Sequence, residues 1–181
     1  MSTQFKRLPN AFKSKRKNKR FTPPDPPAPE QFSVVDPELR RLERLLDDAK
    51  LAKRVLSLTK RFPVATIPEL VTYDWLQQQN YPFEFQASLF GGRRAPAGVG
   101  LVPDFVVSFD ASRAMVWQVQ GEYWHTRGEK EHTDVAAHVR MLGAIYRGAT
   151  IWKVVELWED DIYSKRPWIF NSALQGVGIR G

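Results

Sequence analysis

The amino-acid sequence predicts an α/β domain, with a mixed central sheet flanked by helices, behind a basic, proline-rich N-terminal arm. The first part of this prediction rests on the order of the patterns between residues 66 and 157: helix, strand, hairpin, helix, strand. Such an order favours a sheet covered by helices. The second part rests on charge, which is concentrated at the start of the chain. The sequence therefore divides into an arm, a connecting helix and a folded domain.

Composition excludes several classes of protein. The 181 residues suffice for one domain and an appendage, and 43% of them are hydrophobic, which supplies a core. The chain has no cysteine, so it forms no disulfide and no cysteine zinc site. No apolar run reaches the roughly 20 residues of a membrane span, and no signal-peptide core follows the basic start. We expect no membrane partner and no secretion, but a cytoplasmic location or one within an intracellularly assembled particle, such as a virion.

The arm comprises residues 1–32. Residues 1–20 hold eight basic groups and no acidic one, which leaves 27 − 8 = 19 basic groups against 20 acidic ones in the rest of the chain. Proline-rich residues 21–30 predict a stiff, extended spacer. Such an arm is suited to bind phosphate backbones without reading sequence, and a solubilising or targeting role has equal weight. Its candidate nucleic-acid contacts are Lys13, Lys15, Arg16, Lys17, Lys19 and Arg20.

Residues 33–62 predict an amphipathic helix. Asp36 is suited to cap its start, and Pro37 then occupies the first helical position. Leucine and alanine recur on one side of the helix up to about residue 60. Either the core of the domain or a partner chain covers this side, and the pattern does not distinguish the two.

The domain of residues 63–181 begins with a predicted helix over residues 66–80. Thr66 and Glu69 have the spacing of a capping box, in which each side chain accepts a hydrogen bond from the other residue's backbone N–H. Apolar and polar residues then alternate strictly from Phe83 to Leu89, which predicts a strand with one buried face over residues 81–90.

A glycine-rich loop is predicted over residues 91–100. It lacks the Gly-Lys-Ser/Thr ending of a phosphate-binding loop and precedes a strand rather than a helix. The loop presents Arg93 and Arg94, which are candidate contacts to a nucleic-acid backbone. A solvated connection is the commoner role of such a loop.

Residues 103–120 predict two apolar strands joined by a tight turn at residues 110–113. Asp104 enters the first strand, and Gln118 and Gln120 leave the second. A carboxylate and polar groups from the neighbouring strand therefore meet at one end of the sheet. Hydrolytic metal sites are commonly built in this way.

The remaining patterns predict a helix over residues 129–142, a strand over 150–157 and a short acidic helix over 158–163. Residues beyond 165 have no assignment. The inner face of the first of these helices is expected to be formed by Val135, Val139 and Leu142.

The predicted hairpin resembles a known family. Its first strand starts with Pro103-Asp104-Phe105, and its second ends in Gln120-Gly121-Glu122-Tyr123-Trp124-His125. This combination is similar to the restriction-endonuclease-like fold and, within that fold, to the very-short-patch repair endonucleases and their small relatives. The resemblance covers roughly residues 64–163. It implies a nuclease-like α/β domain.

The resemblance also implies roles for individual residues. Asp104 corresponds to the chief metal-binding carboxylate, Glu69 to a helical carboxylate that shares the metal, and His125 to a histidine that assists the chemistry. Magnesium prefers oxygen ligands and lowers the pKa of an attacking water. For Glu69 the capping box is the alternative role, and it is the favoured one.

Two positions depart from the family. Most nucleases of this fold have Glu or Asp, one intervening residue and then Lys where this chain has Gln118 and Gln120, and the repair enzymes have a second histidine in place of Gln120. An amide oxygen can ligate a metal but cannot act as a general base. The candidate catalytic residues are therefore Asp104, His125 and Gln120. We expect a catalytically degenerate nuclease-fold protein that binds nucleic acid, DNA above all, or serves with neighbouring protein chains in a large assembly; an active Mg²⁺-dependent DNA endonuclease is the alternative.

Overall fold

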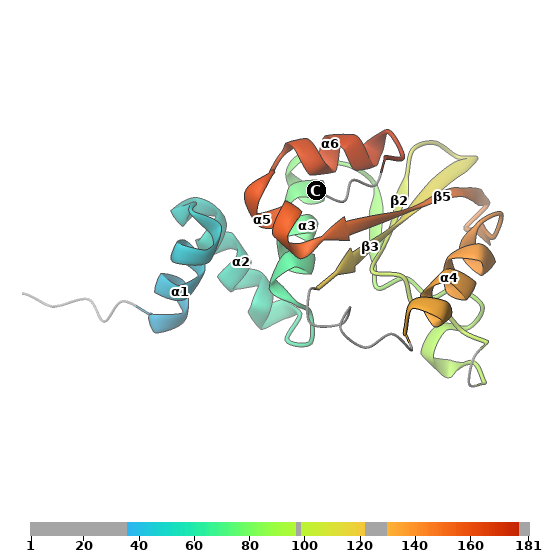
Figure 1. Ribbon diagram of the computed structural model, residues 1–181, viewed down its shortest axis with the longest axis horizontal. Helices are drawn as coiled ribbons and strands as arrows, with labels where there is room; N and C mark the ends of the chain where they lie inside the picture. The colour runs from blue at the N-terminus through green and yellow to red at the C-terminus, as the bar shows by residue number, and fades with distance from the viewer. Residues whose placement is uncertain (1–35, 97–98, 122–129, 178–181) are drawn as a thin grey trace, which may run out of the picture. The chain divides into compact units, whose positions relative to one another are not determined.

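The computed structural model describes residues 36–96, 99–121 and 130–177, with side chains in the last range from residue 136 onward. They form a mixed five-stranded sheet with helices on both faces (Figure 1). The strand order is β1-β2-β3-β5-β4. The predicted α/β class, with its mixed sheet and flanking helices, is confirmed. Within the described part of the chain, no helix combines the length and the apolar character that crossing a membrane requires.

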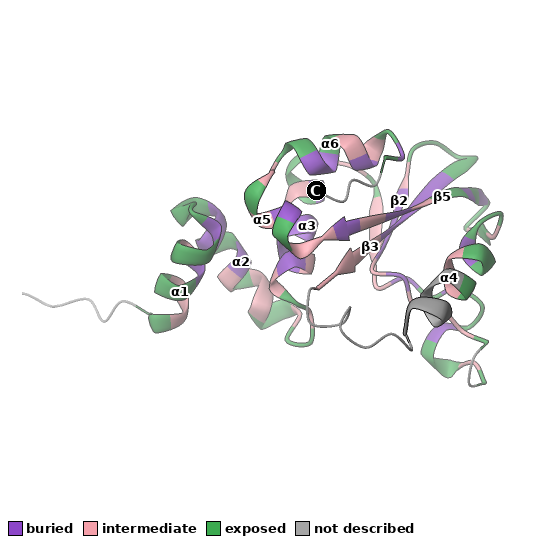
Figure 2. Cartoon of the chain, in the orientation of Figure 1, coloured by how far each residue is buried: buried purple, intermediate pink, exposed green. Residues whose placement is uncertain are grey.

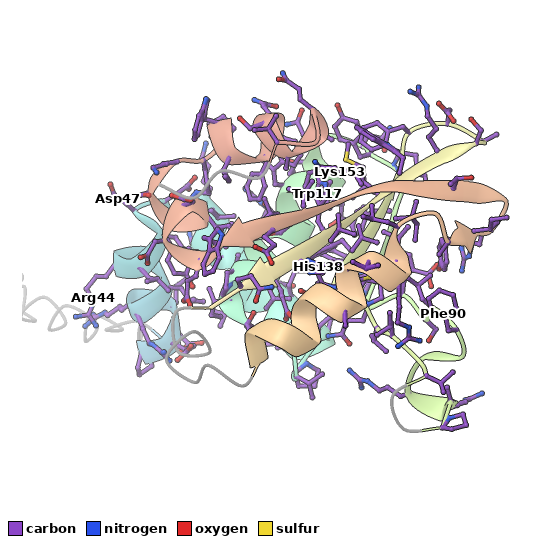
Figure 3. All side chains as sticks on the ribbon, turned by 45° about the vertical axis from the view of Figure 1, so that its right-hand side comes forward. Arg44, Asp47, Phe90, Trp117, His138 and Lys153 are labelled. Atoms are coloured by element: carbon purple, nitrogen blue, oxygen red, sulfur yellow. The ribbon has the colours of Figure 1, made fainter. Side chains whose placement is uncertain are left out.

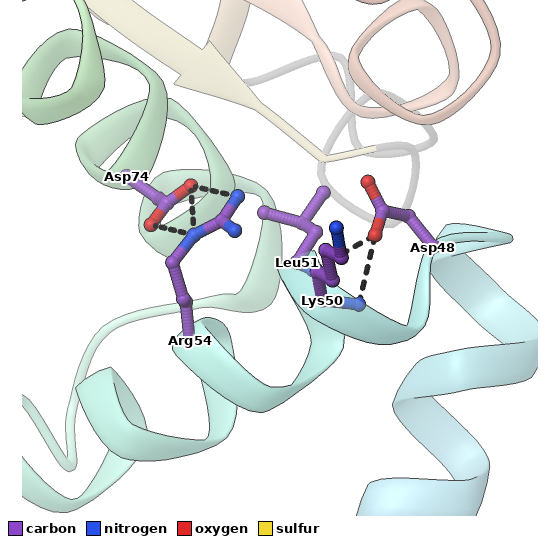
Figure 4. Close-up of polar contacts among 5 residues, drawn as sticks. All are labelled: Asp48, Lys50, Leu51, Arg54 and Asp74. Atoms are coloured by element: carbon purple, nitrogen blue, oxygen red, sulfur yellow. Dashed lines mark hydrogen bonds and ion pairs between the residues drawn. The ribbon is translucent and has the colours of Figure 1, made fainter.

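The first helical region contains two helices, α1 (Pro37–Leu46) and α2 (Ala49–Arg61), so the prediction of one continuous helix is wrong. The break lies at Asp47, whose left-handed backbone (φ 48°) ends α1. Asp48 then starts α2, because its carboxylate accepts hydrogen bonds from the N–H groups of Lys50 and Leu51, both at 2.9 Å (Figure 4). The predicted cap at Asp36 is confirmed.

Helix α3 (Ile67–Gln78) begins with the predicted capping box. The backbone N–H of Thr66 donates to Oε2 of Glu69 at 2.7 Å, and the N–H of Glu69 donates to Oγ1 of Thr66 at 3.4 Å. These two bonds satisfy backbone donors that have no partner within the helix. The start of α3, and with it the position of Glu69, is therefore specified locally.

Strands β1 (Phe83–Phe85), β2 (Phe105–Ser108) and β3 (Arg113–Gln120) are antiparallel neighbours. Strand β5 (Ala149–Trp158) runs parallel to β3, and β4 (Ile145–Tyr146) pairs with the outer edge of β5. The hairpin between β2 and β3 turns as predicted, because the carboxylate of Asp110 accepts the N–H groups of Ser112 and Arg113, both at 2.8 Å. The tight turn fixes the register of the hairpin.

Strand β1 is shorter than the predicted strand over residues 81–90. Gln86 has a left-handed backbone (φ 51°), which ends the strand. Beyond it, Leu89 and Leu101 form a single antiparallel bridge that closes the intervening loop. This loop contains a short 3-10 turn, η1 (Gly92–Arg94).

The two faces of the sheet pack on different helices (Figure 2). Trp117 and Val155 face the larger cluster, which contains side chains of α1, α2, α3, α5 (Glu159–Ser164) and α6 (Trp168–Leu174). Val116 and Ile151 face the smaller cluster on the side of α4 (Lys130–Met141). The acidic helix was predicted; α6 and β4 were not.

The predicted inner face of α4 is wrong for its two described residues. Val139 is 65% exposed and Leu142 is 46% exposed, whereas Met141 is 2% exposed and Ala137 packs against the same cluster. Ala137 and Met141 are four residues apart and so lie on one side of the helix. A small alanine allows α4 to approach the sheet closely. The side chain of Val135 lies outside the described residues.

A buried ion pair joins α2 to α3. The guanidinium of Arg54 donates to both carboxylate oxygens of Asp74, with Nε–Oδ1 at 2.8 Å and Nη2–Oδ2 at 2.9 Å (Figure 4). The Asp74 side chain is 5% exposed, but that of Arg54 is 42% exposed. Removal of Arg54 would therefore leave a buried charge without its partner, whereas removal of Asp74 would leave a charge that water already reaches.

We predict that Arg54→Ala destabilises the protein by about 2–4 kcal/mol, because it leaves the buried Asp74 carboxylate uncompensated. Asp74→Asn should cost less, about 1–2 kcal/mol, since an amide still accepts from a half-exposed arginine. The measurement is urea unfolding at pH 7. Arg41→Ala is the matched control, since its ion pair with Glu38 is exposed and should change stability by less than about 1 kcal/mol. Equal losses for Arg54→Ala and Arg41→Ala would contradict the prediction.

Candidate functional site

The candidate site lies where β2 begins and β3 ends. Asp104 directly precedes β2, and the β2–β3 register, in which Phe105 faces Trp117, continues to place Asp104 opposite Gln118. The backbone N–H of Val119 donates to Oδ2 of Asp104 at 2.8 Å. The sheet edge itself thus orients the Asp104 carboxylate.

Glu69 brings a second carboxylate to the same place. Its side chain, at the start of α3, interacts directly with that of Asp104. The capping box already engages one oxygen of Glu69. The structure therefore brings together the two residues that the sequence proposed as metal ligands, and it also gives Glu69 the capping role that was its alternative. The metal-binding role itself stays a prediction.

The environment of this pair disfavours two negative charges. Burial, and secondarily the adjacent Glu69 carboxylate, raises the pKa of Asp104 to about 7, against the opposing effect of the Val119 N–H group. Near neutral pH, the Asp104 carboxyl is therefore partly protonated. A bound cation would relieve the same repulsion, so proton and cation compete for the pair.

Gln118 and Gln120 point to the α4 side of the sheet, since they alternate along β3 with Trp117 and Val119, which belong to the opposite cluster. Both glutamines are half-buried. Their amides bring neutral oxygen atoms to this end of the sheet but no charge and no general base. Strand β3 therefore offers no side chain at this end of the sheet that could activate a water by taking its proton.

Sequence reasoning missed a second polar pair on this side of the sheet. Glu156 of β5 pairs in register with Gln118, so Asp104, Gln118 and Glu156 follow one another across three neighbouring strands. His138 of α4 lies over this row, with its Nδ1 atom 3.8 Å from Oε1 of Glu156 (Figure 3). The β3–β5 register and the packing of α4 on β5 create this neighbourhood, and no local sequence signal encodes it.

The remaining predicted site residues are divided between the described and undescribed parts of the chain. Arg93 and Arg94 lie in η1 and are exposed. His125 lies outside the described residues, as do all six of the candidate nucleic-acid contacts in the arm: Lys13, Lys15, Arg16, Lys17, Lys19 and Arg20. Within the described ranges, no group of three His, Cys, Asp or Glu side chains is arranged to hold a metal ion.

Comparison with known proteins identifies no relative. No protein-family model, no curated protein and no solved structure matches the chain.

We predict that Asp104→Asn stabilises the protein above pH 7. Because the pKa of Asp104 is raised in the folded state, its contribution is fully present below about pH 4 and is lost as pH rises through about 7. An asparagine at this position can still accept from Val119 and carries no charge. The difference in unfolding free energy between variant and wild type should therefore grow by on the order of 1–2 kcal/mol between pH 4 and 8.

Urea unfolding at several pH values between 4 and 8 measures this difference. Asp110→Asn is the control that should give a flat difference over this range. Hydrogen bonds from Ser112 and Arg113 hold the pKa of Asp110 below its ordinary value, so its contribution is present throughout pH 4 to 8 and is lost only on further acidification. If the unfolding free energies of Asp104→Asn and wild type stay parallel from pH 4 to 8, the pKa of Asp104 is not raised in the folded state and the prediction is wrong.

Proposed function

We propose that this chain is a nucleic-acid-binding protein built on a restriction-endonuclease-like scaffold, whose hydrolytic site has become degenerate. One observation carries the proposal. Two carboxylates, Asp104 and Glu69, meet at the end of the sheet, yet the β3 side chains that share this end, Gln118 and Gln120, are neutral amides. The pair supports cation binding, and the amides argue against efficient hydrolysis.

The donor set fits a weakly held hard cation such as Mg²⁺. Asp104 and Glu69 would hold it, with amide oxygens as neutral ligands. When bound, such a cation offsets charge on phosphoryl oxygens and lowers the pKa of an attacking water. Glutamine, in contrast, cannot take a proton from that water. Binding of a phosphate backbone without its rapid cleavage is the expected outcome.

Nucleic-acid binding draws its support from the distribution of charge. The chain carries eight basic and no acidic groups in residues 1–20, and Arg93 and Arg94 are exposed beside the sheet. The rest of the chain is close to neutral. A role as a subunit of a large assembly such as a virion rests on this basic arm alone.

An active DNA endonuclease is the second candidate, and the contact between Asp104 and Glu69 favours it. In that case His125, which the sequence resemblance proposes as the assisting residue, would supply the proton transfer that the glutamines cannot. The two candidates differ in a single observable, which is cleavage that depends on Asp104.

Plasmid nicking with Mg²⁺ or Mn²⁺ distinguishes the two candidates. We predict that the wild type and Asp104→Ala nick at the same background rate. Gln118→Glu combined with Gln120→Lys, which restores the usual nuclease pattern, should raise nicking at least about tenfold, a gain typical of one added general base or charge. Asp104→Ala in that background should abolish the gain. Wild-type nicking that Asp104→Ala removes would instead establish the active enzyme.

We also predict that the arm supplies most of the affinity for a DNA duplex. Replacing Lys13, Lys15, Arg16, Lys17, Lys19 and Arg20 by Gln should reduce the slope of log K against log salt by up to about 5, since each phosphate contact contributes about 0.9. Fluorescence anisotropy of a labelled 20-base-pair duplex measures the slope. An unchanged slope would exclude the arm from binding.

A further inference from the structure

A hollow beside the carboxylate pair is the feature from which we draw a further inference. Its volume is about 430 Å³, and no acidic residue is among the described residues that line it. It lies in the segment that joins β1 to β2. The lining residues are Gln86, Ser88, Gly91, Arg93, Arg94 and Val102.

The chemistry of this lining suits an anion. Arg93 and Arg94 bring two guanidinium groups, and Gln86 and Ser88 add neutral hydrogen-bond donors. Within the described residues, neither arginine makes a side-chain hydrogen bond or an ion pair. Guanidinium groups match the geometry of phosphate oxygens, to which they often donate two hydrogen bonds at once.

The loop around the hollow is held in place. The N–H of Leu89 donates to the carbonyl of Leu101 at 2.9 Å, and the N–H of Leu101 donates back at 3.0 Å. A Cβ atom on Gly100 would collide with the carbonyl oxygen of Gly92, so close contact of the two glycine backbones closes the loop. The hollow is therefore a preformed feature.

Helix α4 anchors the same loop from the other side. The guanidinium of Arg140 donates to the carbonyl oxygen of Val99 and lies 5.5 Å from the centre of the Phe90 ring. The third arginine of this region thus has a structural role, which leaves Arg93 and Arg94 to face a ligand.

The hollow adjoins the candidate site directly. The backbone N–H of Gln86 donates to the carbonyl oxygen of Asp104 at 2.7 Å, and Val102, another lining residue, is two positions before Asp104. A polyanion that extends from the hollow along this backbone connection would approach Asp104. A single small anion would occupy the hollow alone, whereas a polynucleotide backbone carries a series of phosphates and can extend beyond it.

We propose that this hollow is a phosphate subsite, in which Arg93 and Arg94 hold one phosphodiester group of a DNA strand next to the Asp104–Glu69 pair. The proposal rests on the proposed nucleic-acid-binding function and adds to it a defined place for the backbone. The arm contributes binding affinity away from the carboxylate pair, and the hollow fixes the position of one phosphate group relative to that pair.

The test uses the full chain and a labelled 20-base-pair DNA duplex. Arg93→Gln with Arg94→Gln should weaken binding on the order of tenfold near 0.1 M salt and reduce the slope of log K against log salt by about 1.8, the value for two lost phosphate contacts. Arg93→Lys with Arg94→Lys should keep the slope, because lysine still binds phosphate as a point charge.

The matched control is Arg41→Gln with Arg44→Gln, which removes the same charge from exposed positions of α1. Figure 3 shows Arg44 on the opposite side of the molecule from Phe90 of the loop. The control should change the slope by less than one. Equal effects of the two double variants would overturn the subsite and leave nucleic-acid binding intact, because net charge would then explain both.

Two further outcomes are informative. If the wild type does not bind the duplex at low salt, the proposed function and the subsite both fail, which differs from the equal-effect result. If millimolar inorganic phosphate binds the wild type but not the glutamine variant, while the two proteins bind the duplex equally, the hollow is a small-anion site, and its assignment to a DNA strand is wrong. Circular dichroism of each variant confirms that the fold is retained.

Discussion

Burial of β3 on both faces is the constraint on which the rest of the structure depends. This central strand lies between β2 and β5, and its side chains alternate between two separate apolar clusters. From Ala114 to Trp117 it is fully buried, so no polar chemistry is possible there without a large desolvation cost. Only at Gln118 and beyond does the strand become half-buried. Polar groups therefore collect at this end of the sheet, and the candidate site lies there for the same reason.

Features of the fold that depend on neighbouring residues were predicted well from sequence. The capping box of Thr66 and Glu69 and the turn at Asp110 each involve residues two or three positions apart, so their chemistry is visible in the sequence itself. The break at Asp47 was missed because two adjacent aspartates interrupt the leucine pattern without a glycine or proline. The orientation of α4 was missed because packing favoured a small alanine over exposed valine and leucine.

For the candidate site, too, some residues were predictable from sequence and others were not. Asp104 was identifiable at the start of an apolar strand, and the expectation that it meets Glu69 came from the resemblance noted in the sequence. The position of Glu156 beside Gln118 and close to His138 was not predictable, because it depends on the parallel register of β3 with β5 and on the packing of α4 against β5. Parallel pairs are joined by long connections, and sequence patterns carry little information about their register.

Glu69 takes part in two interactions at once, and this links the candidate site to the stability of the helix that bears it. One of its oxygens caps α3, while its carboxylate also interacts with Asp104. A ligand that pulled this side chain away from the Thr66 N–H would weaken the cap, and a tighter cap would withhold the side chain from such a ligand. By thermodynamic reciprocity, any such coupling between the carboxylate pair and the first turn of α3 would have the same size in both directions. The end of this helix and the carboxylate pair thus share one side chain, so a change at either place acts on the other.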